Sequence, residues 1–183
     1  MNHKKLGAFI FAVTMIGLSI ALIIWQKSTR DLKSENVSGI GRYLELKDKK
    51  IKPIKVETLN GKDFDLSKFE GKEVIINFWA SWCAPCVEEF PSFIKLLKKQ
   101  KGNIIILAVS LDKEENDIKN FIEGFQLKDT NLDIYFSWDK DRELATYFGT
   151  QLLPESYLLD SKHIIRRKII GITDWADYVP SNR

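Results

Sequence analysis

Cysteine and histidine are scarce in this chain, which has 183 residues but only two of each. The two cysteines, Cys83 and Cys86, lie three positions apart, which excludes a secreted scaffold held by several disulfides across long loops. A structural zinc site needs four ligands. His3 precedes a long apolar segment and cannot reach the cysteines, which leaves His163 as the only other histidine. We therefore expect neither a metal nor another cofactor.

A strong charge bias is also missing. The formal net charge is +3, and nine of the 28 Lys and Arg but only four of the 25 Asp and Glu lie in residues 1–50. That part carries +5 and the remainder −2, so the basic surface typical of nucleic-acid binding is not indicated. The basic residues instead surround an N-terminal apolar segment, where they suit lipid headgroups. With 44% hydrophobic and 29% charged residues, the chain resembles neither a disordered nor a multi-span membrane protein.

The apolar segment, residues 6–25, is uncharged for twenty positions. As a helix rising about 1.5 Å per residue it covers the roughly 30 Å of a bilayer core. A cleaved signal peptide is the alternative, but apolar residues continue beyond a small-residue site at 19–21, which favours an uncleaved anchor. Lysines flank the segment on both sides, so charge alone does not fix its orientation. The predicted organisation is a short basic segment (1–5), a transmembrane signal-anchor (6–25), a tether (26–50) and a folded domain (51–183).

The folded domain alternates strand and helix patterns. Residues 73–79 (EVIINFW) form a continuous apolar run, as in a strand covered on both faces. Residues 83–101 carry the apolar spacing of an amphipathic helix, and Asn60-Gly61 predicts a hairpin turn. Further strands are predicted at 55–59, 62–66, 103–111, 132–136, 156–160 and 163–170, and helices at 116–125, 141–148 and 175–179. This order indicates an α/β fold with a central mixed β-sheet flanked by helices.

The cysteines follow the strand at 73–79 and begin the helix. A helix N-terminus carries unpaired N–H groups and about half a positive charge, which stabilises a thiolate. Cys83 is therefore predicted to have a lowered pKa and to act as the attacking nucleophile. Cys86, one turn later on the same face, is close enough to form a disulfide and to displace a mixed-disulfide partner. Pro85 stiffens the turn, and Trp82 offers an apolar surface for a docking peptide.

A purely structural disulfide is the competing interpretation of this pair. A bridge between residues three apart restrains the unfolded chain little, so the context favours redox activity, although CxxC alone is a weak signal.

Glu89 lies three residues after Cys86 on the same helical face. If buried, its pKa would be raised and it would take the proton from Cys86; if exposed, it would only favour the helix dipole. On local grounds Pro154 is a loop proline.

Residues 77–91 (NFWASWCAPCVEEFP), the strands around residues 152–160 (LLPESYLLD) and the N-terminal apolar segment together resemble the TlpA/ResA/CcmG (DsbE) branch of the thioredoxin superfamily. These are extracytoplasmic thiol–disulfide oxidoreductases, often held to the membrane by one N-terminal helix. The resemblance covers about residues 51–179. It implies a thioredoxin-like fold with an N-terminal β-hairpin, a central insertion at about 112–136 and a preceding transmembrane helix.

The resemblance also implies roles for the cysteines and for the acid that follows them. Cys83 matches the exposed nucleophile and Cys86 the resolving cysteine of a redox disulfide. Glu89 matches a buried acid that several members place three residues after the second cysteine. Asn77 departs from cytosolic thioredoxins, which have a buried aspartate there, so their proton route cannot be assumed for this chain.

A second set of roles concerns the loop before the strand at 156–160. Pro154 matches the cis-proline that packs beside the cysteines and helps bind the substrate backbone. Leu153 would then present main-chain groups to an extended peptide. Glu155 matches the second residue of a Pro-Glu pair common in the CcmG group. Trp82, Pro85, Leu153, Pro154 and Glu155 are thus the predicted substrate-binding and supporting residues.

The function implied by the resemblance is reduction of protein disulfides, above all those of apocytochrome c during cytochrome c maturation. A membrane thiol donor of the DsbD/CcdA type would re-reduce the pair. The expected location is the cell membrane, single-pass, with the catalytic domain on the extracytoplasmic (periplasmic) side. Alternatives are an oxidoreductase with another client or an oxidase role, and a non-catalytic binding module. A peroxidase acting through Cys83 alone is a further alternative, for which the sequence has no distinct motif.

Overall fold

The computed structural model describes residues 15–27, 40–128 and 130–180, and the chain divides into two compact units, Met1–Ile40 and Gly41–Arg183. In the first unit, residues 15–27 are helical and their large apolar side chains are exposed. The first part of the predicted transmembrane segment, residues 6–14, lies outside the described residues. Within the part that is described, no helix combines the length and the apolar character needed to cross a membrane.

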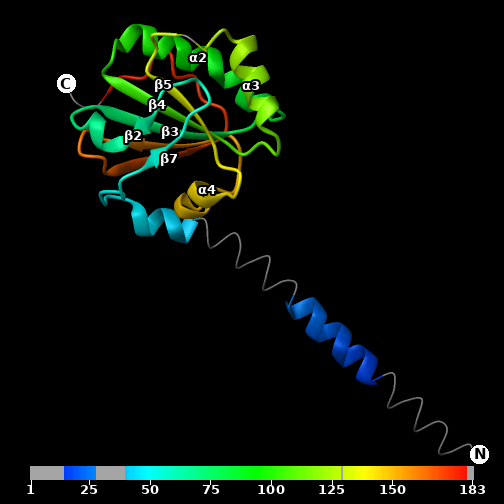
Figure 1. Ribbon diagram of the computed structural model, residues 1–183. Coiled ribbons are helices and arrows are strands. Elements are labelled where there is room, and N and C mark those ends of the chain that lie inside the picture. Colours follow the sequence, from blue (N-terminus) through cyan, green and yellow to red (C-terminus); the bar gives the residue numbers. More distant parts are fainter. Residues whose placement is uncertain (1–14, 28–39, 129, 181–183) are drawn as a thin grey trace, which may run out of the picture. The chain divides into compact units, whose positions relative to one another are not determined.

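The second unit is built on a five-stranded sheet with the order β5-β4-β3-β6-β7 (Figure 1). Its strands are β3 (Glu73–Trp79), β4 (Ile104–Ser110), β5 (Ile134–Trp138), β6 (Glu155–Leu159) and β7 (Ile165–Ile170). β4 runs parallel to β3 and β5, whereas β6 runs antiparallel to β3 and β7. Strands β3 and β4 are buried along their whole length, as their unbroken apolar sequences predict for central strands. The predicted mixed sheet is confirmed.

Helices cover both faces of this sheet (Figure 1). On one face, α2 (Ala84–Gln100) and α3 (Glu115–Gly124) share a core cluster with side chains from β3, β4 and β5. The rings of Trp79, Phe90 and Phe121 meet there with centroids 4.3 to 4.9 Å apart. On the other face, α4 (Glu143–Phe148) contributes to a second cluster. The aromatic packing fixes the start of α2 against the end of β3.

The segment that precedes the sheet packs on the second cluster. Residues 40–46 form a helix within the predicted tether, and Leu46 is buried. The predicted hairpin is confirmed, but its strands are short: β1 (Lys55–Val56) pairs antiparallel with β2 (Phe64–Asp65), and a 3₁₀ helix, η1 (Leu66–Phe69), follows. Gly61 in the connecting turn has φ +75°, a conformation that glycine adopts without steric cost.

The predicted C-terminal helix at 175–179 is wrong. Residues 176–177 form only a turn, and the segment is held against side chains of α2. The Thr173 amide donates to Glu89 Oε1 and the Trp175 amide to Ser92 Oγ, both at 3.1 Å. The Trp175 ring also stacks on Phe93, with centroids 5.2 Å apart. These contacts with a distant helix outweigh the local preference for helix.

The strand predicted at 132–136 is shifted by two residues. Lys62 Nζ donates to the carbonyl oxygens of Thr130 and Leu132, at 2.8 and 3.0 Å, which occupies the backbone just before β5. The side chain of Asn60 then binds the backbone of Ile134 and Phe136. The hairpin loop therefore determines where β5 begins.

Candidate active site

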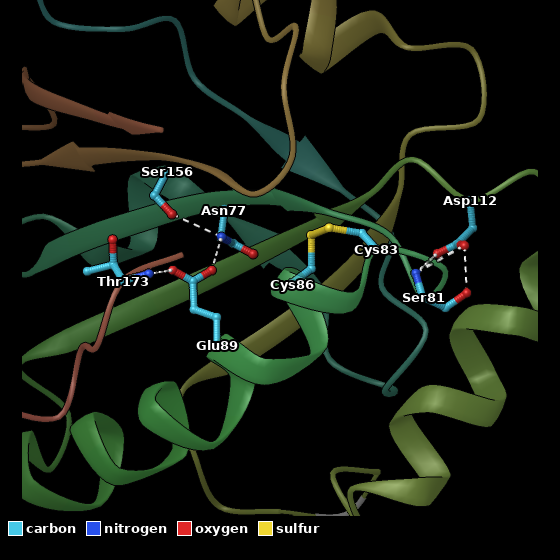
Figure 2. Close-up of a disulfide and its surroundings, with 8 residues drawn as sticks. All are labelled: Asn77, Ser81, Cys83, Cys86, Glu89, Asp112, Ser156 and Thr173. Carbon is cyan, nitrogen blue, oxygen red and sulfur yellow. Dashed lines mark hydrogen bonds between the residues drawn. A yellow bond between two sulfur atoms is a disulfide. The ribbon is translucent and has the colours of Figure 1, made fainter. Parts of the chain in front are cut away.

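The two cysteines lie where β3 leads into α2, and a disulfide joins them (Figure 2). Cys83 is the N-cap residue of α2, and Pro85 lies in the first turn. The amides of Cys86 and Val87 donate to the Cys83 carbonyl oxygen, at 2.9 and 3.1 Å. The structure thus places Cys83 at the positive end of the helix dipole, as the sequence predicts.

The two sulfur-bearing residues differ in accessibility. Cys83 is 6% exposed and Cys86 is 1% exposed. Trp82 is 68% exposed, so its ring is available to a docking partner next to Cys83. Trp79 is fully buried in the core and cannot contribute to such a surface. A sulfur atom arriving from solvent can therefore approach Cys83 more readily than Cys86.

Glu89 is the buried acid of this site. It is 2% exposed, and Figure 2 shows it on the same side of α2 as Cys86. Its Oε1 accepts hydrogen bonds from Trp175 Nε1 at 2.7 Å and from the Thr173 amide at 3.1 Å. Burial raises the pKa of Glu89 from 4.5 to about 7, although these hydrogen bonds oppose the shift. The interpretation of Glu89 as an exposed residue is thereby excluded.

Asn77 of β3 lies between Glu89 and the disulfide (Figure 2). Its side chain is fully buried, and its Nδ2 donates to Glu89 Oε2 at 3.3 Å and to Ser156 Oγ at 2.9 Å. Its Oδ1 is buried and has no hydrogen-bond partner among the described residues. The contact between Asn77 and Glu89 links the central strand to the active-site helix.

Asp112 is a site residue that the sequence analysis missed. Its carboxylate is 3% exposed and accepts hydrogen bonds from the Ser81 amide at 3.0 Å and from the hydroxyl groups of Ser81 and Ser110, at 2.8 and 2.7 Å. It therefore holds the loop that carries Trp82 and Cys83 (Figure 2). A signal was present, because Ser81 and Asp112 each closely follow one of two neighbouring parallel strands, whose carboxyl ends meet at the same edge.

The peptide bond between Leu153 and Pro154 is cis, as the resemblance implies. The Pro154 carbonyl oxygen accepts a hydrogen bond from the Gly171 amide at 2.9 Å, so this loop is tied to the end of β7. Leu153 is partly buried and packs against both core clusters, whereas Leu152 is exposed. The loop is thus held firmly at the proline and presents an apolar side chain to solvent just before it.

Glu155 follows Pro154 directly and is the first residue of β6. It is 1% exposed, and its Oε1 forms an ion pair with Lys168 Nζ at 3.0 Å and accepts a hydrogen bond from the Tyr157 hydroxyl at 2.6 Å. Burial, followed by the contact with Glu155, raises the pKa of Tyr157. Lys168 Nζ also donates to the Gly149 carbonyl at 3.4 Å. The Glu155 carboxylate is therefore held by side chains of β6 and β7 and is not available to a partner from solvent.

The site offers the chemistry of thiol exchange. It combines a disulfide, one sulfur more accessible than the other, and a buried acid whose pKa lies near neutrality. Within residues 15–27, 40–128 and 130–180, no cluster of three or more His, Cys, Asp and Glu side chains is arranged to hold a metal ion. Groups of this kind can move electron pairs between sulfur atoms and a proton to or from a carboxylate.

Comparisons with known proteins agree with this geometry. The sequence profile described as the AhpC/TSA family matches residues 48–168. The thiol-disulfide oxidoreductase ResA of Bacillus thuringiensis subsp. konkukian is 34% identical over 117 residues, which are 63% of this chain and 65% of ResA. The thioredoxin-like protein YneN of Bacillus subtilis is 31% identical over 119 residues, 63% of this chain and 66% of YneN. The chain therefore matches slightly less than two thirds of the length of these relatives.

A solved structure shares the fold. The thioredoxin domain of a thiol-disulfide oxidoreductase from Bacteroides vulgatus superimposes with a TM-score of 0.60 at 25% sequence identity. The match covers 72% of this chain and 93% of that domain. The part of the chain that carries the sheet, the helices and the cysteine pair is thus similar to a thioredoxin domain.

Proposed function

The chain belongs to the AhpC/TSA family of thioredoxin-like proteins, and from this premise we propose that it is a membrane-anchored thiol–disulfide oxidoreductase that reduces protein disulfides outside the cytoplasm. The observation that carries the proposal is the disulfide between Cys83 at the N-cap of α2 and Cys86, with Glu89 buried one turn further on. ResA, which bears the name of a thiol-disulfide oxidoreductase, supports the same activity.

The reaction begins with the reduced pair. The Cys83 thiolate attacks one sulfur of the client disulfide, which forms a mixed disulfide and releases the other client sulfur as a thiolate. Cys86 loses its proton, for which Glu89 is the acceptor, and attacks Cys83 Sγ. The bond between Cys83 and the client breaks and the enzyme retains the oxidised pair. The client leaves with two thiols, one proton coming from Cys86 by way of Glu89 and the other from water. Two electrons have moved to the client, and a thiol donor must supply two more for the next cycle.

The substrate surface and the location belong to the same proposal. Trp82, Pro85, Leu153 and Pro154 would hold an extended client segment beside Cys83, with Glu155 supporting the loop. Residues 6–25 would anchor the chain and residues 26–50 would connect the anchor to the domain. The exposed apolar side chains on the helix at 15–27 support an anchoring role. The proposed client is apocytochrome c, and the proposed donor is a membrane dithiol protein of the DsbD/CcdA type.

The reduction potential of the Cys83–Cys86 pair tests the direction of the reaction. The full chain is titrated against mixtures of reduced and oxidised dithiothreitol, and the redox state is followed by tryptophan fluorescence. A potential at or below about −230 mV, towards thioredoxin, is expected for a reductant. A potential near about −120 mV, where strong oxidants lie, would instead assign the chain to disulfide formation.

Client reduction requires a separate test with a matched pair of variants. Cys86→Ser should accumulate a mixed disulfide between Cys83 and an oxidised apocytochrome c, because the resolving thiol is absent. Cys83→Ser should accumulate none. Equal trapping by both variants would contradict the assigned roles, and rapid peroxide consumption by Cys83 in the Cys86→Ser variant would favour a peroxidase instead.

A further inference from the structure

We propose that Asn77 is a positioning residue of the redox centre: its carboxamide oxygen accepts the S–H group of Cys86 when the disulfide is reduced, while its amide group holds Glu89. The proposal rests on the proposed thiol–disulfide exchange. It adds a residue whose hydrogen bonding differs between the oxidised and the reduced protein. Asn77 stands where cytosolic thioredoxins have a buried aspartate, but a carboxamide does not ionise, so the role proposed here is not that of an acid.

The orientation of the Asn77 carboxamide follows from its neighbours. Nδ2 is 3.3 Å from Glu89 Oε2 and 2.9 Å from Ser156 Oγ. Both contacts are donated by the amide nitrogen, so the N–H side of the carboxamide faces Glu89 and Ser156. The amide oxygen is thereby directed away from Glu89, and Figure 2 shows it on the side of the disulfide.

The amide oxygen lacks a donor in the oxidised state. Asn77 is fully buried, and Oδ1 has no hydrogen-bond partner in the described part of the chain. A buried acceptor without a donor destabilises the state in which it occurs. The disulfide beside it has no hydrogen to donate, because both cysteine sulfurs are bonded to each other. The oxidised protein therefore contains an unsatisfied acceptor at the redox centre.

Reduction supplies the missing donor. When dithiothreitol reduces the pair, the Cys83–Cys86 S–S bond breaks, two electrons and two protons enter, and dithiothreitol closes to its cyclic disulfide. Cys86 is 1% exposed, so its new thiol must find an acceptor inside the protein rather than in water. A thiol is a weak donor, and Asn77 Oδ1 is the neighbouring acceptor that is still unoccupied. The hydrogen bond forms only in the reduced state, which it stabilises relative to the oxidised state.

The first test compares the full-length chain with Asn77→Leu, which has a similar volume and no polar atoms. Loss of the acceptor should make the disulfide about tenfold harder to reduce by dithiothreitol, a shift of about −30 mV in potential. Ser137→Ala is the matched control. It removes another buried oxygen that has no partner among the described residues, in the edge strand β5 rather than in the strand that leads to the cysteines, and should change the equilibrium constant less than twofold.

The second test observes the bond itself. Infrared spectra of the full-length Cys83→Ala chain contain the S–H stretching band of Cys86 alone, since the chain has no third cysteine. The band should lie at lower frequency than that of an alkyl thiol in an apolar solvent, which has no acceptor, and Asn77→Leu should abolish this difference. Asn77→Asp retains an acceptor oxygen at the same position and should restore it. A purely structural role of Asn77 would change stability without moving this band.

The outcomes separate this inference from the function on which it rests. If the pair titrates normally and Asn77→Leu changes neither the potential nor the S–H band, the role of Asn77 is refuted and the oxidoreductase remains. If wild type cannot be reduced and reoxidised at all, the proposed function fails as well. Should Asn77→Leu fail to fold, the band of the Cys83→Ala chain still decides, because a frequency equal to that of an alkyl thiol in an apolar solvent overturns the proposal.

Discussion

Burial of Glu89 should make the stability of the oxidised protein depend on pH in a predictable direction. Its pKa is raised from 4.5 to about 7, so the folded state binds a proton that the unfolded state has already lost. Stability therefore falls as pH rises from about 4.5 to 7, by about 1.4 kcal/mol per pH unit, and levels off above pH 7. The total loss attributable to this one residue is roughly 3 kcal/mol.

Glu89→Gln isolates this contribution. The glutamine oxygen can still accept the hydrogen bonds from Trp175 and Thr173, but the side chain no longer ionises. The difference in unfolding free energy between variant and wild type should therefore rise by roughly 3 kcal/mol in favour of the variant between pH 4.5 and pH 8. Differences are compared because other carboxylates, such as Asp160 with its lowered pKa, add pH dependence of the opposite sign in both proteins.

The assay is urea unfolding of the full chain in non-ionic detergent, followed by tryptophan fluorescence under oxidising conditions at several pH values. Glu88→Gln removes a carboxylate from the exposed side of the same turn and controls for the change in net charge. Parallel stability curves for wild type and Glu89→Gln would refute the reasoning. They would mean that Glu89 ionises at the same pH in the folded and unfolded chains.

Three further predictions concern reactivity and the supports of the site. Glu89→Gln should slow resolution of a mixed disulfide at Cys83 by about 10² or more, measured by stopped-flow fluorescence, if the acid accepts the proton; an unchanged rate would exclude it. Lys168→Met should lower the free energy of unfolding, measured in urea, by about 3–5 kcal/mol because it leaves the Glu155 carboxylate buried and unpaired. The double variant Lys168→Met, Glu155→Gln should recover most of this loss, and additive losses would argue against a buried pair. Asp112→Ala should lower the free energy of unfolding by about 1–3 kcal/mol for each buried donor left unpaired. It should also raise the alkylation rate of reduced Cys83, whereas an unchanged rate would show that the loop is held by other contacts.

The central elements could be predicted because their sequences allow little choice. β3 has the bounds expected from the run EVIINFW, and α2 differs by one residue at each end from the predicted helix. Both segments are buried by neighbours that the pattern itself implies: an apolar strand requires cover on two faces, and an amphipathic helix requires a sheet. The position of Cys83 at the start of α2 followed from these two boundaries.

Contacts over long sequence distances could not be predicted in the same way. The Thr173 and Trp175 donors lie more than 80 residues from Glu89 in sequence. No local pattern indicates that both donate hydrogen bonds to its carboxylate. These contacts also replaced the helix expected at 175–179. Similarly, Lys168 lies 13 residues after Glu155 on the neighbouring strand, and its charge gives no sign that it is buried. Residues that support a site from other elements need the strand order before they can be assigned.

The combination of Asn77 and Glu89 explains why this site can operate with one buried acid. An aspartate at position 77 would place a second carboxyl group within hydrogen-bond distance of Glu89, where like charges oppose each other and one pKa rises strongly. The neutral amide instead donates to Glu89, which lowers its pKa and brings it nearer to neutrality than burial alone would allow. In the proposed mechanism Glu89 would then both take and return a proton at physiological pH, which a carboxyl group with a much higher pKa would not do. The roughly 3 kcal/mol that its ionisation costs the fold is therefore the consequence of the same burial that would suit it to the proposed role of proton acceptor for Cys86.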